Sequence, residues 1–292
     1  MRSISQLEEA EALDRVVAAG QRVARWLRPG PVRDALNGVW LGHPLHPVLA
    51  QAPVGAWLSA AVLDGWPGCG KNGAGKHGGR DSSGEAGQRR LVAFGLAAAG
   101  AAALAGAADW SEQHEQQMRV GVVHAAANVT AASFYGASLL TRRPAASRAL
   151  RLAGLAAVTA GGLLGGHISF RLSGGANQAE PVPHLIEPGW HDLMPAAGLK
   201  DAQPAKAMLG DVPVVVIRDG GDVHVLAGRC SHLSGPLAEG ELDAGRLTCP
   251  WHGSVFRITD GAVVHGPATA PQPVFRTRVR AGVIQVCLPD AG

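Results

Sequence analysis

The sequence predicts two fold classes in one chain of 292 residues: an all-α four-helix transmembrane bundle followed by an all-β domain, a small antiparallel β-sandwich. Three observations predict this. Four long stretches without Asp, Glu, Lys or Arg occupy the first part, and short β-branched runs separated by Gly and Pro occupy the second. The last third also carries two Cys/His pairs between such runs. The net charge is only +3, and the basic residues lie near the ends of apolar stretches, so nothing indicates a nucleic-acid partner.

Residues 1–34 form the first predicted region. Between Ile4 and Leu27, apolar residues recur at helical spacing among charged ones that include Arg15 and Arg22. This pattern predicts an amphipathic helix that lies on a membrane surface.

Residues 35–170 are predicted to form a four-span membrane domain. A span needs about 20 predominantly apolar residues. A soluble, Ala-rich bundle is the alternative, but soluble helices normally carry a polar stripe that these stretches lack. Between the first two spans, Gly65–Gln88 is rich in Gly and charged residues, which predicts a loop. The four uncharged stretches are residues 35–63, 91–108, 120–141 and 152–170.

Residues 171–190 are polar and contain prolines, which predicts a linker to the β domain at 191–292. Val212–Arg218 and Val223–Ala227 are β-branched runs joined by Asp-Gly-Gly-Asp, a hairpin pattern. Further short strands are predicted at Leu247–Cys249, Val255–Ile258, Ala262–Val264, Val274–Arg280 and Val283–Val286.

Two loops between these strands carry the Cys/His pairs, Cys230-Ser231-His232 and Cys249-Pro250-Trp251-His252. Two thiolates and two imidazoles suit an asymmetric 2Fe–2S cluster in which one iron takes both Cys and the other takes both His. Zinc could take the same four ligands, but zinc sites usually pair Cys with Cys and His with His along the sequence.

Over roughly the last hundred residues, this pattern resembles the Rieske iron–sulfur family. The resemblance implies that Cys230 and Cys249 bind the buried iron, while His232 and His252 bind the outer iron and face a partner. The His265-Gly266-Pro267-Ala268 stretch resembles the proline-containing loop that covers the cluster in such domains.

Two departures from the high-potential Rieske proteins bear on the reduction potential. Those proteins have two further cysteines that form a disulfide, where this chain has Gly235 and Trp251. They also use a Ser and a Tyr hydroxyl to hydrogen-bond the cluster sulfurs. This chain has Ser254 at the first of these positions, where it would contact the cluster without being a ligand, but it has Phe256 at the second. Losing one donor predicts a potential in the lower half of the range of roughly −150 to +300 mV, as in the ferredoxin type.

The membrane half resembles a bacterial family of multi-pass membrane domains of uncharacterised function. The resemblance rests on Gly42-His43-Pro44-Leu45-His46-Pro47 and on Asp109-Trp110. Four spans would bring His43, His46, His124 and His167 into one leaflet, on the side of the Rieske domain. Histidines on facing helices can hold haem b axially. His124 and His167 are the favoured pair, with His43 or His46 as the substitute. Quinone or proton handling, another metal, and structural polar contacts are the alternatives.

Together these features predict a membrane-anchored Rieske-type electron-transfer protein in a bacterial inner membrane. It would pass single electrons through a 2Fe–2S cluster to a redox partner protein or a quinone, with haem b in its own membrane domain as a candidate. The alternatives are a quinol-oxidising Rieske subunit and a redox-sensing membrane protein. An electron carrier or oxidoreductase component is favoured over a stand-alone enzyme. Basic residues concentrate in the loops opposite the Rieske domain, which favours an outward-facing Rieske domain.

Overall fold

The computed structural model describes residues 2–24, 26, 29–65 and 82–288. Its chain divides into two compact units, which are described separately. The helical unit comprises residues 1–26 and 45–172, and the β unit comprises residues 27–44 and 173–292. The β unit therefore takes a segment from before the first long helix as well as the C-terminal part of the chain.

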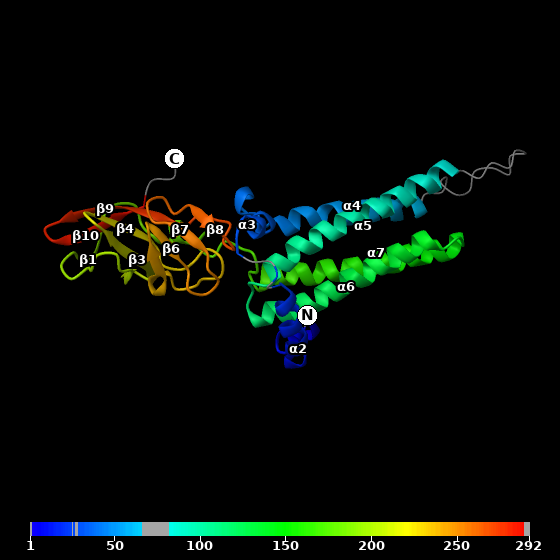
Figure 1. Cartoon of the computed structure of the whole chain (residues 1–292), viewed down its shortest axis with the longest axis horizontal. Coiled ribbons are helices and arrows are strands. Elements are labelled where there is room, and N and C mark those ends of the chain that lie inside the picture. The colour runs from blue at the N-terminus through cyan, green and yellow to red at the C-terminus, as the bar shows by residue number, and fades with distance from the viewer. Residues whose placement is uncertain (1, 25, 27–28, 66–81, 289–292) are drawn as a thin grey trace, which may run out of the picture. The chain divides into compact units, whose positions relative to one another are not determined.

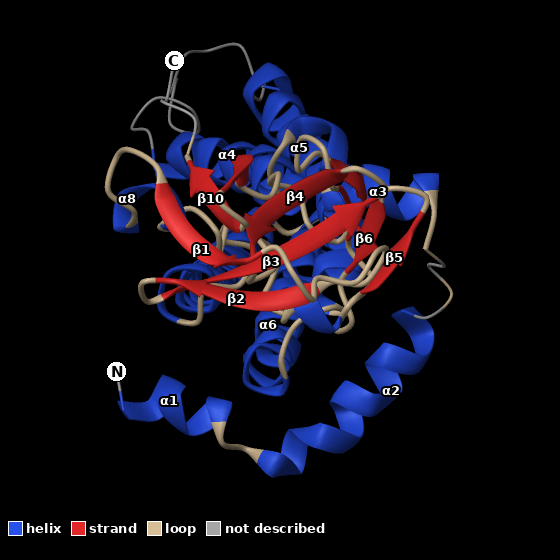
Figure 2. Cartoon of the chain, turned by 90° about the vertical axis from the view of Figure 1, so that its left-hand side faces the viewer, coloured by secondary structure: helices blue, strands red, loops and turns tan. Residues whose placement is uncertain are grey.

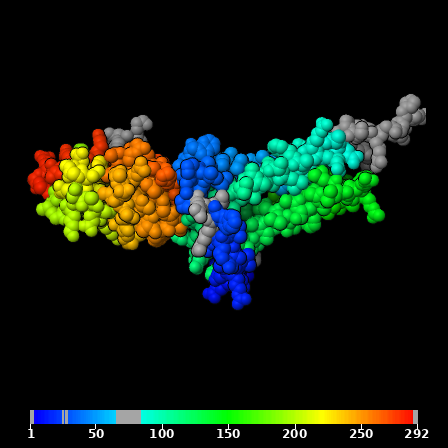
Figure 3. Space-filling view, viewed as in Figure 1, coloured from blue at the N-terminus to red at the C-terminus, as the bar shows by residue number. Residues whose placement is uncertain are grey.

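Four long helices make up most of the helical unit. α4 runs beside α5, and α6 runs beside α7 (Figures 1 and 3). The π-helical turn η3 continues α7 from His167 to Arg171. Four helices were expected here, and their bounds are α4 (Leu45–Gly65), α5 (Ser82–Trp110), α6 (Glu115–Leu140) and α7 (Pro144–Gly166).

All four helices begin at residues other than the starts of the uncharged stretches, and the difference is largest for α4 and α5. The first long helix begins at Leu45 instead of residue 35, because Gly38 and Gly42 adopt left-handed φ angles of 84° and 79° that interrupt a helix. The expected loop at Gly65–Gln88 is shorter, since its last residues, from Ser82 onward, belong to α5. The part of that loop at residues 66–81 lies outside the described residues.

Aromatic rings and glycines fill the interior of the helical unit. Trp57 of α4 stacks on Tyr135 of α6, with ring centres 4.3 Å apart. A Cβ on Gly95 would meet the indole of Trp57, and one on Gly154 would meet the ring of Tyr135, at less than 3 Å in each case. The small residues of the apolar stretches thus give the two large rings their space and let the helices approach closely.

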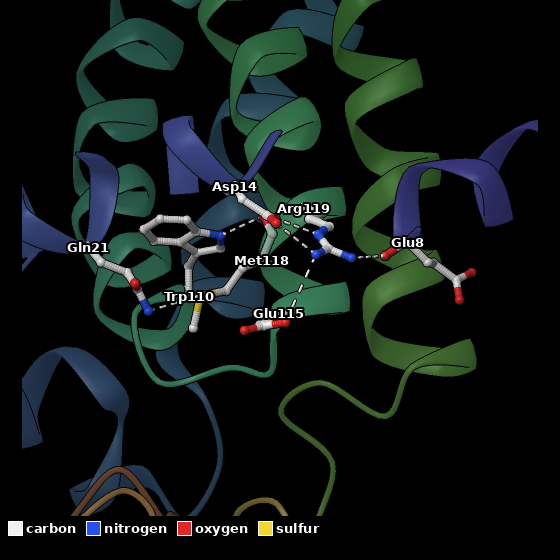
Figure 4. A network of polar contacts seen from close by, with 7 residues as sticks. All are labelled: Glu8, Asp14, Gln21, Trp110, Glu115, Met118 and Arg119. Carbon is white, nitrogen blue, oxygen red and sulfur yellow. Dashed lines mark hydrogen bonds and ion pairs between the residues drawn. The ribbon is translucent and has the colours of Figure 1, made fainter. Parts of the chain in front are cut away.

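The N-terminal region forms two helices, α1 (Arg2–Glu8) and α2 (Asp14–Ala24), instead of the single amphipathic helix expected from residue 4 to 27. Arg119 of α6 explains the break. Its guanidinium donates to both oxygens of Asp14, at 2.7 and 3.0 Å, and to the backbone oxygen of Glu8, at 3.0 Å (Figure 4). One arginine therefore holds the end of α1 and the start of α2, and the turn η1 (Glu11–Leu13) joins them.

Two described helices are long and apolar enough to cross a membrane: the segment Gly84–Trp110 and the segment Pro144–Arg171. α4 and α6 are not apolar enough, by their mean hydropathy, to be counted with them. α6 carries Asn128 and Thr130 as well as His124 within its length, which lowers its mean hydropathy. A helical N-terminal region is established, whereas a bundle of four transmembrane helices is not.

The β unit contains two antiparallel sheets. The larger has six strands in the order β1-β10-β9-β4-β3-β2, and the smaller has four in the order β5-β6-β7-β8 (Figure 2). The predicted hairpin corresponds to β3 and β4, and every further predicted strand is present. The strands are β1 (His191–Pro195), β2 (Ala205–Leu209), β3 (Val212–Asp219), β4 (Asp222–Ala227), β5 (Glu241–Asp243), β6 (Arg246–Thr248), β7 (Val255–Arg257), β8 (Val263–His265), β9 (Val274–Arg280) and β10 (Val283–Cys287).

Two segments that precede residue 191 in the sequence also belong to the β unit. The segment expected to be a linker, 171–190, contains the short helix α8 (Val182–Leu185), and Val182 is buried in the core of the larger sheet. Residues 27–44 contribute α3 (Pro31–Asn37) and η2 (Val39–Leu41). α3 lies beside β8 (Figure 1) and is held there by a contact between Asp34 and His265. The observed β unit thus extends beyond the predicted domain at 191–292.

Candidate metal centre

The two loops that carry the Cys/His pairs fold in the same way. In the first, the Cys230 N–H donates to Gly235 O and the Ser234 N–H donates to Cys230 O. In the second, the Cys249 N–H donates to Ser254 O and the Gly253 N–H donates to Cys249 O. Each Cys thus opens a turn with the same pair of backbone hydrogen bonds, and Ser234 and Gly253 occupy the equivalent left-handed position, with φ near 63° and 73°.

Both thiols are buried at one end of the smaller sheet. Cys230 and Cys249 are 1% and 3% exposed and belong to an apolar cluster that includes Phe256 and Ile258. The two thiols lie beside each other, and the interaction between them raises the pKa of Cys230 and lowers that of Cys249. The two loops thus bring both sulfurs together in the apolar interior.

The imidazoles of His232 and His252 are side by side and only partly buried. Their ring centres are 5.1 Å apart and their planes are almost perpendicular. Two imidazoles bound through nitrogen at about 2 Å to one metal have ring centres roughly 5 to 6 Å apart. The two histidines are therefore spaced to share one iron.

The four side chains fit a cluster better than a single ion. Sulfur lies with sulfur in the apolar interior, and imidazole lies with imidazole at the more exposed edge. A cluster of two irons can take one pair of like ligands on each iron, which suits a thiol pair and an imidazole pair.

Ser254 and Phe256 occupy the positions expected to affect the cluster sulfurs, and both are fully buried. The hydroxyl of Ser254 lies beside the thiol of Cys230, and its oxygen accepts the N–H of Ala268 at 2.9 Å. Phe256 lies in the same apolar cluster as both cysteines but has no polar atom to offer them. The site therefore has one of the two hydroxyl donors.

Gly235 and Trp251, which stand where a disulfide joins the loops of high-potential relatives, are in contact. A Cβ on Gly235 would lie 2.7 Å from the sulfur of Cys249 and 3.3 Å from the indole of Trp251. Gly235 is thus needed for the close approach of the two loops. The indole of Trp251 lies close to this glycine.

Sequence reasoning missed Gln272, which holds the first ligand loop. Its side chain is 1% exposed and donates to the backbone oxygens of Ala227 and Arg229, while its oxygen accepts the N–H of Ser231 at 3.1 Å. An amide side chain can both donate and accept, so one residue satisfies three backbone groups. A lone Gln between two prolines carries no sequence pattern that predicts this role.

In the helical unit, the structure brings His124 together with His46 instead of His167. The rings of His46 and His124 have centres 6.1 Å apart. His167 instead has its Nε2 2.8 Å from Glu8. His43 lies in the β unit, where its ring is exposed and its Nδ1 is 3.1 Å from the backbone oxygen of Pro44.

Backbone carbonyls orient both rings of this pair. Nδ1 of His46 lies 2.8 Å from Ala102 O, and Nδ1 of His124 lies 2.7 Å from Gly161 O. Because a carbonyl can only accept, each Nδ1 carries the proton and each Nε2 keeps its lone pair. Nε2 of His124 accepts from the amide of Asn128 at 3.2 Å.

The β unit and its segregated thiol and imidazole pairs define a Rieske-type iron–sulfur protein. Residues 189–276 match the Rieske [2Fe-2S] domain model. The anthranilate 1,2-dioxygenase ferredoxin subunit of Burkholderia cepacia is 31% identical over 97 residues, which are 33% of this chain and 90% of that protein. The chain belongs to the Rieske [2Fe-2S] domain family through this region, and such a domain implies a 2Fe–2S cluster.

Two further matches show the same limits of the similarity. Human apoptosis-inducing factor 3 is 32% identical over 88 residues, which are 30% of this chain but only 14% of that protein. The structure of the Sphingomonas yanoikuyae B1 ferredoxin has 25% sequence identity and a TM-score of 0.33, and covers 35% of this chain and all of the ferredoxin. The family membership concerns the β unit.

Proposed function

We propose that this protein is a membrane-anchored electron carrier of the Rieske ferredoxin type, with Cys230, His232, Cys249 and His252 as the ligands of its 2Fe–2S cluster. The observation that carries the proposal is that the two loops bring the buried thiols together in an apolar cluster and bring the two partly exposed imidazoles together, with ring centres 5.1 Å apart. Electrons would enter and leave through His232 and His252, the ligands nearest to solvent. A redox partner protein is the favoured partner, because similar proteins include ferredoxin subunits of dioxygenases.

Exposed apolar side chains support the membrane anchor. A core helix of a soluble protein is mostly buried, but only 28% of the most apolar window of α5, and of α7, is buried within the structure. Large apolar residues point outward on all four long helices, more than a soluble monomer usually exposes. We therefore propose that α4 to α7 all cross the membrane. The exposed residues include Leu58 and Val62 on α4, Phe94 and Leu104 on α5, Val129 and Leu140 on α6, and Leu152 and Leu163 on α7.

Extraction of isolated membranes tests the anchor. We expect the full-length protein to remain in the membrane pellet after an alkaline carbonate wash and to be released by detergent. Release by carbonate alone would show a peripheral protein and would refute the four-span proposal. Labelling of single cysteines placed at the exposed Arg143 and Asp222 from either side of the membrane would then establish which side each occupies.

Phe256→Tyr is expected to raise the midpoint potential of the cluster. The new hydroxyl lies in the apolar cluster with both cysteines, and a hydrogen bond to a sulfur stabilises the more negative reduced state. A bond about 1 kcal/mol stronger in the reduced state corresponds to roughly 40 mV for one electron. Ser254→Ala should change the potential in the opposite direction. A redox titration followed by electron paramagnetic resonance measures both, and a wild-type midpoint near the top of the Rieske range would favour the quinol-oxidising alternative.

A second candidate function concerns the His46–His124 pair, which we propose as a cofactor site in the helical unit. Its ring separation of 6.1 Å is near that of two imidazoles on one metal, and both Nε2 atoms keep a lone pair. Haem b is the cofactor that such a pair would hold in a helix bundle. The competing interpretation is a polar contact between helices, in which Asn128 satisfies Nε2 of His124.

A dithionite-reduced minus air-oxidised spectrum of the detergent-purified protein separates these two interpretations. A sharp b-type haem band that is lost in both His46→Ala and His124→Ala, and kept in the control His43→Ala, would support the second cofactor. If the spectrum shows only the broad bleaching of an iron–sulfur cluster, the two imidazoles are interhelical contacts and the haem proposal fails.

A further inference from the structure

Asp34, far from the ligands in sequence, binds the loop that follows β8. Its Oδ1 accepts the N–H of Gly266 at 2.9 Å, and its Oδ2 lies 2.9 Å from Nδ1 of His265. The Asp34 side chain is only 18% exposed, whereas that of His265 is half exposed. The carboxylate is thus shielded from water on the side where it meets the loop.

Close packing fixes the position of this contact. A Cβ on Gly266 would meet the side chain of Val39 at 3.0 Å, that of Asn37 at 3.2 Å and that of Asp34 at 3.4 Å. Residues of α3 and η2 therefore fit against the bare backbone at Gly266. Asn37 is 1% exposed, which shows how completely this part of the interface is closed.

Two residues after Gly266, the same loop reaches the metal centre. The N–H of Ala268 donates to Ser254 Oγ at 2.9 Å, and the Ser254 hydroxyl lies beside the thiol of Cys230. Ala268 is fully buried among the apolar residues around both cysteines. Residues 265–268 are therefore held at both ends. Asp34 binds their first two residues, and Ser254, which lies beside a proposed ligand sulfur, binds the last.

We propose that Asp34 is a positioning residue for the iron–sulfur site: it holds the 265–268 loop closed over the cluster and sets the reduction potential through its charge. The inference rests on the proposed function, because it presupposes that Cys230 is a cluster ligand. A carboxylate that binds the loop over the cluster makes the reduced state, which is more negative, less favourable. Removing the charge raises the potential, and removing the hydrogen bond to Gly266 lets the loop open.

Two substitutions separate these effects. Asp34→Asn keeps an oxygen that can accept from Gly266 but removes the charge, so it should shift the redox equilibrium toward the reduced state about three- to tenfold, roughly 30 to 60 mV for one electron. Asp34→Ala removes both, so it should in addition increase the rate at which a chelator extracts iron from the oxidised protein. Asp34→Glu should restore the wild-type rate at least in part.

Asp260→Asn is a matched control in the same unit. Asp260 also accepts a backbone N–H, from Ala262 at 3.0 Å, and it also contacts a nitrogen-bearing side chain, that of Arg257 at 2.8 Å. Its turn is linked to the first ligand loop through the N–H of Gln272, which donates to Gly261 O at 2.8 Å. Asp260→Asn keeps this backbone bond and the acceptor for Ala262, so the control should leave the potential and the iron release unchanged.

The measurements use the full-length, cluster-loaded protein in detergent, with paramagnetic resonance to follow the midpoint and absorbance to follow iron loss. The inference is overturned if both Asp34 variants keep the wild-type midpoint and iron release, or if Asp260→Asn changes them equally. Absence of a Rieske signal in the wild type would instead refute the proposed function itself, so the two failures are distinguishable.

Discussion

Cys249→Ala is expected to abolish the iron–sulfur cluster completely. The substitution removes one of two thiols that are in contact in an apolar interior, and no other described cysteine is near enough to replace it. An iron with one thiolate missing would face apolar side chains that cannot act as ligands. Iron and sulfide content and the paramagnetic resonance spectrum of the reduced protein measure the loss.

Cys287→Ala provides the matched control for this prediction. Cys287 is also a buried cysteine of the β unit, 5% exposed, but it lies in β10 of the larger sheet. Its loss should leave the cluster signal and the iron content at wild-type values. An intact Rieske signal in Cys249→Ala, or equal losses in both variants, would show that the proposed ligand set is wrong.

Arg151→Ala is expected to destabilise the helical unit by about 3 to 5 kcal/mol, because it leaves a buried carboxylate without its partner. Arg151 of α7 donates two hydrogen bonds to Asp64 of α4, at 2.7 and 2.5 Å, and a third to Ser147. Both charged side chains are less than 10% exposed. Thermal or denaturant unfolding in detergent, followed by circular dichroism, measures the effect.

Two further variants test the cause of this loss. Arg148→Ala removes an exposed arginine from the same helix and should change the stability by no more than about 0.5 kcal/mol. The double variant Asp64→Leu with Arg151→Met removes both charges and should recover most of the lost stability. A double variant as unstable as Arg151→Ala would mean that packing, and not the unpaired carboxylate, is responsible.

The β domain and its two Cys/His loops could be predicted because the sequence patterns that specify them lie within short segments of the chain. The β-branched runs around Val212 and Val223 specify the hairpin, and the spacing of each Cys and His within one loop places both side chains on that loop. β1, β2 and β5 were missed, since β1 ends in a proline and β5 has only three residues, two of them acidic. Such short edge strands depend on pairing with their neighbours more than on propensity.

Contacts between distant parts of the chain could not be predicted in the same way. Asp34 and Gly266 are 232 residues apart, and nothing in the sequence around residue 34 distinguishes it from the start of a membrane helix. His167 pairs with Glu8 at the end of α1. From the sequence, a histidine in an apolar helix was predicted to bind a cofactor, because the local pattern does not show which residue it meets. Pairings of this kind are decided by tertiary packing, which local patterns do not encode.

The position of α3 in the β unit affects how the protein is made. During synthesis at about 5 to 20 residues per second, Asp34 emerges roughly 10 to 50 s before Gly266, its partner 232 residues later. All four long helices are translated in that interval. The β unit can thus bind one of its first-made segments only after strands β1 to β8 have been made. A recombinant fragment that starts at residue 173 would contain the four proposed ligands but not the residues that close the loop over them.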